Sequence, residues 1–265
     1  MAKIEGDLAE ALRILRDYFE QRQIPFALMG ALVPALLLSS EIGVRETRDA
    51  DHVIRLQSWE AWNEVIADLG DLGFTRGRDE LEHRLYYKTA EIDLIPFGIF
   101  DGLSDVLIWP KSGNRMNMTG FLEVFQFATP TEVTPGVTLP VVPLWLFAVL
   151  KVVAYSDREF PRDLHDLVYV LDQYEHVGQS SRRFDLTGAV DGLTFEVAGA
   201  FLLGQDVRLN TSAEALNLVR GFIAKITDEH HSLINIMLRE ENRLFSDERR
   251  QAIFQLIAAF RQGLV

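Results

Sequence analysis

The amino-acid sequence predicts an α+β fold, with a mixed α/β lobe over residues 1–142 followed by an all-helical lobe over 143–265. Three observations support this prediction. Up to about residue 142, short β-prone runs alternate with amphipathic helical segments. After Pro143 nearly every segment has helical period. No repeat, low-complexity tract or glycine- and serine-rich linker marks a further domain, and 265 residues are enough for two docked lobes.

Turn residues bound the β-prone runs of the first lobe. These runs lie at 24–30 and 50–56, twice within 83–98, and in the stretches GFLEVFQF (120–127) and GVTLPVV (136–142). The letters KTAE between the two runs of 83–98 predict a hairpin. The amphipathic helices of this lobe are expected at 5–22, 31–40 and 59–73. Pro34 falls in a first helical turn, where its missing N–H costs little.

Helices dominate the second lobe. PLWLFAVLKVVAYSDR (143–158) and PRDLHDLVYVLDQY (161–174) have helical spacing, and Pro161 suits the first position of its helix. From about residue 190 almost the whole chain has the same period.

Composition excludes several classes of protein. Hydrophobic residues at 48% and charged residues at 25% are ordinary for a globular chain. The net charge of −13, most of it in residues 1–150, repels phosphate backbones and disfavours broad DNA binding. The most apolar stretch, 137–155, is broken by two prolines and a lysine, so no membrane span is expected. With no cysteine and no signal-peptide pattern, a cytoplasmic location is expected.

The segment RETRDADHVIRL (45–56) places Asp49 and Asp51 two residues apart at the start of a β-prone run. In a strand such residues share a face, with Cα atoms ~6.6–7 Å apart. Two carboxylates ~5 Å apart at an effective dielectric of ~20 repel by about 3 kcal/mol. A proton, an arginine or a divalent cation could offset this, and Mg2+, which prefers hard oxygen ligands, does so best.

A third acidic residue, Asp93, lies among apolar residues in EIDLIPF (91–97). A carboxylate is costly there unless it is paired. If this strand lies beside that of Asp51, the three carboxylates form a cluster suited to two-metal nucleotidyl transfer. The third carboxylate could also accept the proton of an attacking hydroxyl.

Structural explanations compete with this interpretation. A D-x-D pair often occurs by chance, and Asp49 could cap a turn near RETRD. Asp93 could merely pair with a core arginine such as Arg84.

Gly30, in FALMGALV (26–33), ends one predicted strand and opens a predicted helix. The free N–H groups of such a junction can hold a phosphate, and glycine allows close approach of a ligand. A plain tight turn explains the same residue equally well.

Lys151 interrupts a strongly apolar predicted helix, where a lysine either extends to the surface or meets an anion. Tyr155 and Arg158 follow at helical spacing and are expected to line one side with it. Two cations there could offset charge on a triphosphate. In the next helix Asp163 suits the helix dipole, whereas Asp166 is expected to contact Lys151 or Arg162.

The remaining chemical groups give weaker signals. Arg45 could bind Asp93 or a phosphate or be a surface residue, and Thr47 could cap a turn. The histidines show no metal-ligand spacing, although Arg158 and His165 loosely match a HEPN-type ribonuclease pattern. The aromatic residues fit a core better than a base-stacking platform. No Walker-type loop, nucleophile elbow or Rossmann fingerprint occurs.

Gly30, followed 19 residues later by D-A-D and then by Asp93 on a separate strand, resembles the DNA polymerase beta-like nucleotidyltransferase superfamily. More narrowly, RETRDADHV resembles the R-x-T-x-D-h-D stretch of AbiEii/AbiGii-type toxin nucleotidyltransferases. LKVVAYSDREFPRDLHDL (150–167) is similar to their K-h-x-A-x-x-x-R and R-D-x-x-D-L helix pair. The match covers residues 24–175, and AFLLGQDV (200–207) is a looser similarity.

The resemblance implies a nucleotidyltransferase-like first lobe, with the helical lobe closing over the active-site cleft. It implies that Asp49 and Asp51 hold Mg2+ (or Mn2+) and that Asp93 is the third metal ligand or the base. The nucleotide-binding residues it implies, together with the neighbouring candidates above, are Gly30, Ala31, Arg45, Thr47, Lys151, Arg158 and Asp166. Position 31 departs from the family, which usually has glycine or serine there.

The expected function is therefore transfer of an NMP from an NTP to an acceptor hydroxyl, with release of pyrophosphate. The resemblance implies a toxin beside an antitoxin protein, with a tRNA end or a protein as acceptor; a small molecule is a further alternative. Two other functions stay open: a catalytically weak nucleotide-binding or partner-binding protein that retains the fold, and a metal-dependent phosphohydrolase.

Overall fold

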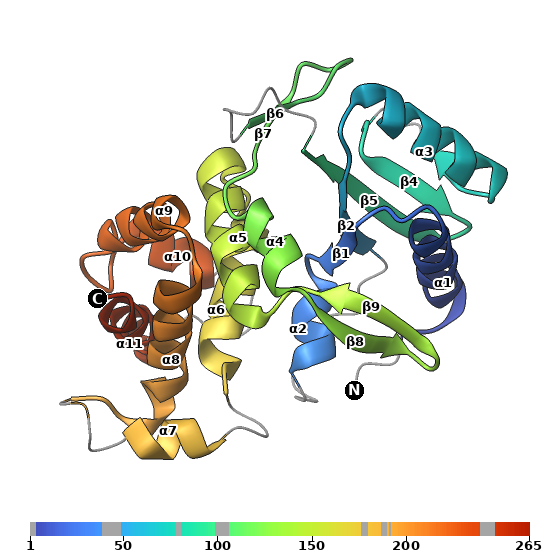
Figure 1. Cartoon of the computed structure of the whole chain (residues 1–265). Coiled ribbons are helices and arrows are strands. Elements are labelled where there is room, and N and C mark those ends of the chain that lie inside the picture. Colours follow the sequence, from blue (N-terminus) through green and yellow to red (C-terminus); the bar gives the residue numbers. More distant parts are fainter. Residues whose placement is uncertain are drawn as a thin grey trace. The chain divides into compact units, whose positions relative to one another are not determined.

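The protein consists of two compact units, Met1–Pro143 and Leu144–Val265, in the computed structural model (Figure 1). The structure describes residues 4–38, 49–77, 81–98, 106–175, 180–186, 190, 192–238 and 247–265. The first unit combines a mixed sheet with helices and the second is helical. The predicted α+β order of the chain is confirmed.

A seven-stranded mixed sheet forms the centre of the first unit, in the order β3-β4-β5-β2-β1-β9-β8. Its strands are β1 (Phe26–Met29), β2 (Asp49–Arg55), β3 (Thr75–Arg76), β4 (Arg84–Tyr87), β5 (Ala90–Phe97), β8 (Thr129–Thr134) and β9 (Val137–Val141). The pairs β2–β5 and β1–β9 are parallel, and the other neighbours are antiparallel. A separate pair joins β6 (Val106–Ile108) and β7 (Arg115–Asn117). The predicted hairpin within 83–98 is the antiparallel pair β4–β5.

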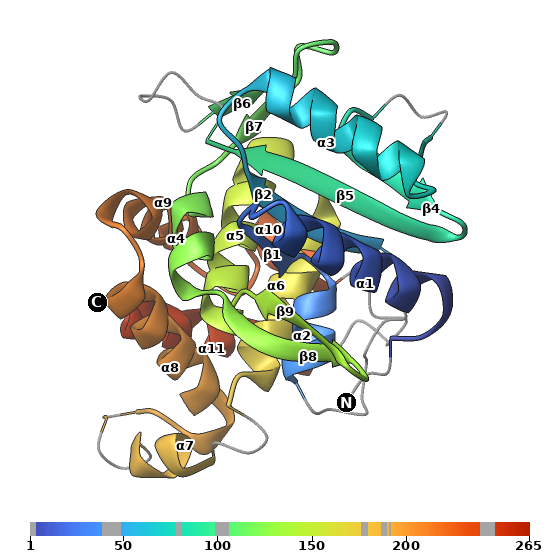
Figure 2. The same ribbon diagram turned by 45° about the vertical axis from the view of Figure 1, so that its right-hand side comes forward.

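Four helices accompany this sheet: α1 (Gly6–Gln21), α2 (Leu32–Leu37), α3 (Trp59–Asp71) and α4 (Phe121–Phe127). Helix α1 packs on β4, β5 and β9 with its apolar stripe, as its spacing predicts (Figure 2). Ser58 caps α3 by accepting a hydrogen bond from the Ala61 N–H at 3.2 Å. Helix α2 is shorter than the predicted 31–40, and residues 39 and 40 lie outside the described residues.

The β-prone interpretation of residues 120–127 was wrong, because α4 occupies this stretch. Phe121 and Phe125, one helical turn apart, both stack on Phe97 of β5, at ring-centroid distances of 6.3 and 5.7 Å. Tertiary packing of the i, i+4 pair therefore outweighs the β propensity of the phenylalanines.

The second unit contains seven helices in the part of the chain described. They are α5 (Leu144–Arg158), α6 (Pro161–Gln173), α7 (Ser180–Leu186), α8 (Phe195–Asn210), α9 (Ala213–Ala224), α10 (Ser232–Leu238) and α11 (Asp247–Gly263). Pro161 begins α6, as predicted. Over the described ranges of both units, none of the helices combines the length and apolarity that crossing a membrane requires.

Helices α8 and α11 touch through their backbones. A Cβ atom on Gly204 would lie 2.3 Å from the Phe260 carbonyl oxygen, and one on Gly263 would lie 2.1 Å from the Phe201 carbonyl oxygen. Both distances are far below contact distance, so only glycine fits at either position. This contact explains a glycine in the interior of α8, where it otherwise costs about 1 kcal/mol relative to alanine.

Candidate functional site

Four acidic side chains lie on one face of the central sheet. The parallel strands β2 and β5 pair Asp49 with Glu91 and Asp51 with Asp93. Residues paired across parallel strands share a face, as do residues two apart along one strand. The strand of Asp93 therefore lies beside that of Asp51, as expected, and the backbones of this pair are ~4.8 Å apart. All four residues are half-buried.

Gly30 makes room for the carboxylate of Asp51. The register of β1 and β2 pairs Met29 with Asp51, so Gly30 follows directly at the end of β1. Gly30 has φ +76°, and a Cβ atom there would lie 1.8 Å from Asp51 Oδ2. Ala31, the next residue, has ordinary helical φ and ψ at the start of α2. Glycine is thus required by the aspartate itself, whereas a phosphate contact at Gly30 and Ala31 stays a prediction.

Arg84, on β4, binds the carboxylate of Asp93 at two points. Its Nε atom lies 2.8 Å from Oδ1 and one terminal nitrogen lies 2.9 Å from Oδ2. The other terminal nitrogen lies 3.1 Å from Glu91 Oε2. His83 Nε2 lies 3.8 Å from Asp93 Oδ2. The sequence left open whether Asp93 meets a metal or this arginine, and the arginine contact is present.

The predicted convergence of Asp49, Asp51 and Asp93 is realised in the backbone but not in the side chains. Within the described ranges, no three His, Cys, Asp or Glu side chains are gathered so that they could hold a metal ion. A physical reason is the two-point contact, which directs both oxygens of Asp93 to Arg84.

The donors nevertheless fit Mg2+. This ion usually binds one or two carboxylates and completes its octahedron with water and substrate phosphates, without an all-protein cage. Asp49 and Asp51, on one face of β2, supply two hard carboxylates, and the missing Cβ of Gly30 provides the space that the second carboxylate occupies.

Glu91 is the residue of this face that the sequence analysis missed. The signal was present, because E-I-D repeats in β5 the two-residue spacing that D-A-D has in β2. The contacts of Arg84 with both Asp93 and Glu91 could not be predicted from the sequence, because they depend on the register of β4 against β5.

His52 lies on the opposite face of β2 and is completely buried. Its neighbours along the strand, Val53 and Ile54, are buried as well. Loss of solvation lowers the pKa of His52 to about 4. The side chain is therefore neutral at pH 7.

In the second unit, Lys151 meets two aspartates of α6. Its Nζ atom lies 2.6 Å from Asp166 Oδ2 and 3.2 Å from Asp163 Oδ1. The expected contact between Asp166 and Lys151 is therefore present, and Lys151 does not extend to the surface, because its side chain is only 12% exposed. Arg158 also binds Asp163 at two points, each at 2.9 Å. Asp163, 1% exposed, is thus the centre of an ion cluster, which is more than the predicted dipole role.

Of the expected row of Lys151, Tyr155 and Arg158, the two cations lie on one side of α5, because both bind Asp163, whereas Tyr155 does not join them. Tyr155 is buried and its ring packs edge-on against Phe222 at 5.7 Å. The apolar contact outweighs the helical spacing that suggested a shared polar side.

Arg45 and Thr47 lie outside the described residues. His165 has a structural contact, because its Nε2 atom lies 2.8 Å from the carbonyl oxygen of Ile236. The ribonuclease pattern receives no support from this arrangement. Trp62 and Trp109 are buried, as expected of core aromatics.

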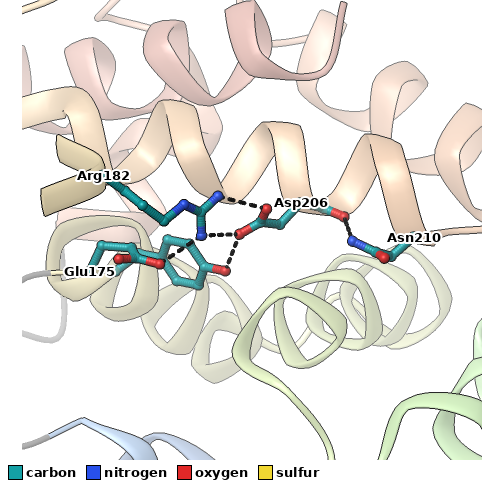
Figure 3. A network of polar contacts seen from close by, with 5 residues as sticks. Glu175, Arg182, Asp206 and Asn210 are labelled. Carbon is teal, nitrogen blue, oxygen red and sulfur yellow. Dashed lines mark hydrogen bonds and ion pairs between the residues drawn. The ribbon is translucent and has the colours of Figure 1, made fainter. Parts of the chain in front are cut away.

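A second polar network in the helical unit joins α7 and α8 (Figure 3). Arg182 binds both carboxylate oxygens of Asp206, at 2.8 and 3.0 Å, and Glu175 at 2.7 Å. Tyr174 donates to Asp206 at 2.6 Å, and Asn210 donates to the Asp206 carbonyl oxygen. Burial of Glu175 raises the pKa of its carboxyl. Asp206 belongs to AFLLGQDV, and its role is to tie these helices together.

No protein-family model matches this chain, and no curated protein gives a significant match to its sequence. Several solved structures are similar to this chain. An antigenic nucleotidyltransferase-like protein from Paracoccidioides brasiliensis is 14% identical, over 63% of this chain and 77% of its own, with a TM-score of 0.42. The lincosamide antibiotic adenylyltransferase LnuA, in its lincomycin-bound form, is 17% identical, over 63% of this chain and 96% of its own, with a TM-score of 0.39.

The antibiotic-resistance factor ANT(2'')-Ia is 12% identical, over 82% of this chain and 91% of its own, with a TM-score of 0.38. At these identities and TM-scores the likeness is loose, and no residue role passes from those proteins to this chain.

Proposed function

We propose that this protein is a Mg2+-dependent nucleotidyltransferase that moves an NMP from an NTP to an acceptor hydroxyl. The observation that carries the proposal is the register of β2 and β5, which sets Asp51 beside Asp93 with Asp49 on the same face. The spacing of Gly30 before the D-x-D pair adds support, because Gly30 provides the space that Asp51 occupies.

In this proposal Asp49 and Asp51 would hold Mg2+, with Mn2+ as a substitute. The bound cation would supply Lewis-acid polarisation of the phosphate oxygens and charge neutralisation. Asp93, oriented by Arg84, would take the proton of the attacking acceptor hydroxyl. The acceptor oxygen forms a bond to the α-phosphorus as the bond from that phosphorus to the bridging oxygen breaks, and pyrophosphate leaves with the electron pair.

For Lys151 of the helical unit, a triphosphate-binding role is proposed from the resemblance of residues 150–167 alone. Asp163 and Asp166, which bind the Lys151 ammonium, would fix its position. Nucleotide-binding roles for Gly30, Ala31, Arg45, Thr47 and Arg158 remain proposals that substitution can test.

The acceptor is proposed to be a hydroxyl of a tRNA end, a protein or a small molecule. The similarity of RETRDADHV to the toxin stretch supports a toxin role beside an antitoxin protein. The net charge of −13 argues against an extended nucleic-acid footprint.

Two labels on the NTP test the reaction. The protein is incubated with Mg2+, a mixture of acceptors and each NTP labelled at the α- or the γ-phosphate. Transfer of the α-label, release of the γ-label as pyrophosphate, and loss of both in Asp49→Ala and Asp51→Ala would support the enzyme. Free phosphate in place of pyrophosphate would instead indicate a phosphohydrolase.

A second candidate function has its own observation. Arg84 binds both carboxylate oxygens of Asp93, and position 31 is alanine where the family usually has glycine or serine. These two features favour a catalytically weak nucleotide-binding or partner-binding protein that retains the fold. Tight NTP binding without turnover, under the same conditions, would favour this candidate.

A further inference from the structure

Arg84 uses all three of its guanidinium nitrogens on the acidic face of the sheet. Two of them bind Asp93 at 2.8 and 2.9 Å, and the third lies 3.1 Å from Glu91. The register of β4 and β5 pairs Arg84 directly with Asp93, so the contact follows from the fold. The arginine side chain is 25% exposed and that of Asp93 14% exposed, which shields the pair partly from water.

Arg84 lies beside a group of acidic residues on the same face of the sheet. Asp49, Asp51, Glu91 and Asp93 place four carboxylates on one face of two adjacent strands. Arginine keeps its charge under all ordinary conditions, and its planar fork matches a carboxylate at two points. A lysine could supply the charge but not the two-point geometry.

We propose that Arg84 is a positioning residue with two separable effects on the proposed reaction. Its fork fixes the orientation of the Asp93 carboxylate, and its charge compensates the acidic face while no divalent cation is bound. This inference rests on the proposed function, since it assigns Asp93 a step in the transfer.

The two effects can be separated by two substitutions. Arg84→Lys keeps the charge and removes the fork, whereas Arg84→Gln removes both. Arg16→Gln is a matched control, because Arg16 is 20% exposed and binds Asp17 at 2.7 Å on helix α1. All three variants and the wild-type chain are compared in full length.

Three measurements are made on each protein: Tm with and without Mg2+, the Kd for Mn2+ by electron paramagnetic resonance, and kcat and KM for transfer. Without Mg2+, Arg84→Gln is expected to have a Tm several degrees below that of the wild type. Mg2+ should restore part of this loss, so the increase in Tm on adding Mg2+ should be larger for Arg84→Gln than for the wild type. Its Kd for Mn2+ should fall about tenfold, because a positive charge next to the bound cation is gone. Its kcat should fall about 100-fold with little change in KM, as loss of an oriented base predicts.

Arg84→Lys should have the same Kd for Mn2+ as the wild type and the same increase in Tm on adding Mg2+. Its kcat should still fall about tenfold or more. The charge role would be overturned if the wild type, Arg84→Gln and Arg16→Gln showed the same increase in Tm on adding Mg2+ and the same Kd for Mn2+. Unchanged kcat in Arg84→Lys would overturn the orienting role.

Failure of the proposed function has a different signature. If no protein responds to Mg2+ or binds Mn2+, the metal site itself is refuted. If the wild type binds Mn2+ but transfers nothing, the transferase is refuted, while the charge effect of Arg84 on Mn2+ binding is still measured.

Discussion

Replacing His52 by leucine should make the stability of the first unit less sensitive to acid. His52 is completely buried on β2, and burial lowers its pKa to about 4, against about 6.5 in an unfolded chain. Between these values the unfolded chain binds a proton that the folded chain does not, so stability rises with pH across that window. The contribution is fully present above pH 6.5 and is lost as the pH falls toward 4.

The magnitude follows from the same two pKa values. On lowering the pH from 7.5 to 5, the free energy of unfolding should fall by about 2 kcal/mol on account of this group alone, at about 1.4 kcal/mol per pH unit of unequal protonation. His52→Leu has no such group. The gap in unfolding free energy between the variant and the wild type should therefore shift by about 2 kcal/mol in favour of the variant over this pH range.

Urea denaturation at pH 7.5, 6 and 5, followed by tryptophan fluorescence, measures this gap. Three of the four tryptophans, Trp59, Trp62 and Trp109, belong to the first unit. His230→Gln is the control, because His230 is largely exposed, with a side chain 74% accessible, and should show no such shift. A gap between His52→Leu and the wild type that stays constant from pH 7.5 to 5 would refute a neutral, buried histidine in the folded state.

Three further substitutions have definite expected outcomes. Gly30→Ala should abolish the proposed transfer, because the new Cβ would lie 1.8 Å from Asp51 Oδ2 and the residue has φ +76°. The left-handed backbone alone costs about 1–2 kcal/mol of stability, which denaturation measures. Gly204→Ala should lower the unfolding free energy of the helical unit by about 1–3 kcal/mol despite the better helix propensity of alanine, and a more stable variant would contradict the close helix contact. Asp163→Ala should destabilise the same unit by about 3 kcal/mol, since it removes the buried carboxylate that both Lys151 and Arg158 bind. Circular dichroism melts should show a smaller loss for Asp166→Ala, because the side chain of Asp166 is more exposed.

The strand positions of the acidic residues could be predicted because they depend on local pattern. Asp49 and Asp51 begin a β-prone run, and Asp93 interrupts an apolar one, so each strand was recognisable alone. Their common face then follows from the two-residue period of a strand. The adjacency of Asp51 and Asp93 was a conditional expectation, and the parallel register of β2 and β5 meets the condition.

The contacts of these residues could not be predicted, because they depend on register and packing between distant segments. Arg84 reaches Asp93 only since β4 and β5 pair at those two residues, and a shift by one residue would turn Arg84 to the other face. Tyr155 had the spacing of a polar row, yet Phe222, far along the chain, draws its ring into the core. The position of Asp163 in the first turn of α6 predicted only a favourable interaction with the helix dipole. Its ion pairs with Lys151 and Arg158 depend on how the preceding helix packs against α6.

Where α8 and α11 cross, Gly204 and Gly263 bring main chain against main chain. The distance between the two axes is therefore fixed by peptide geometry, and no choice of side chain can tune it. Cysteines, labels or stabilising substitutions introduced into the helical unit should be placed at least one turn away from this crossing, where side chains rather than carbonyl groups set the spacing.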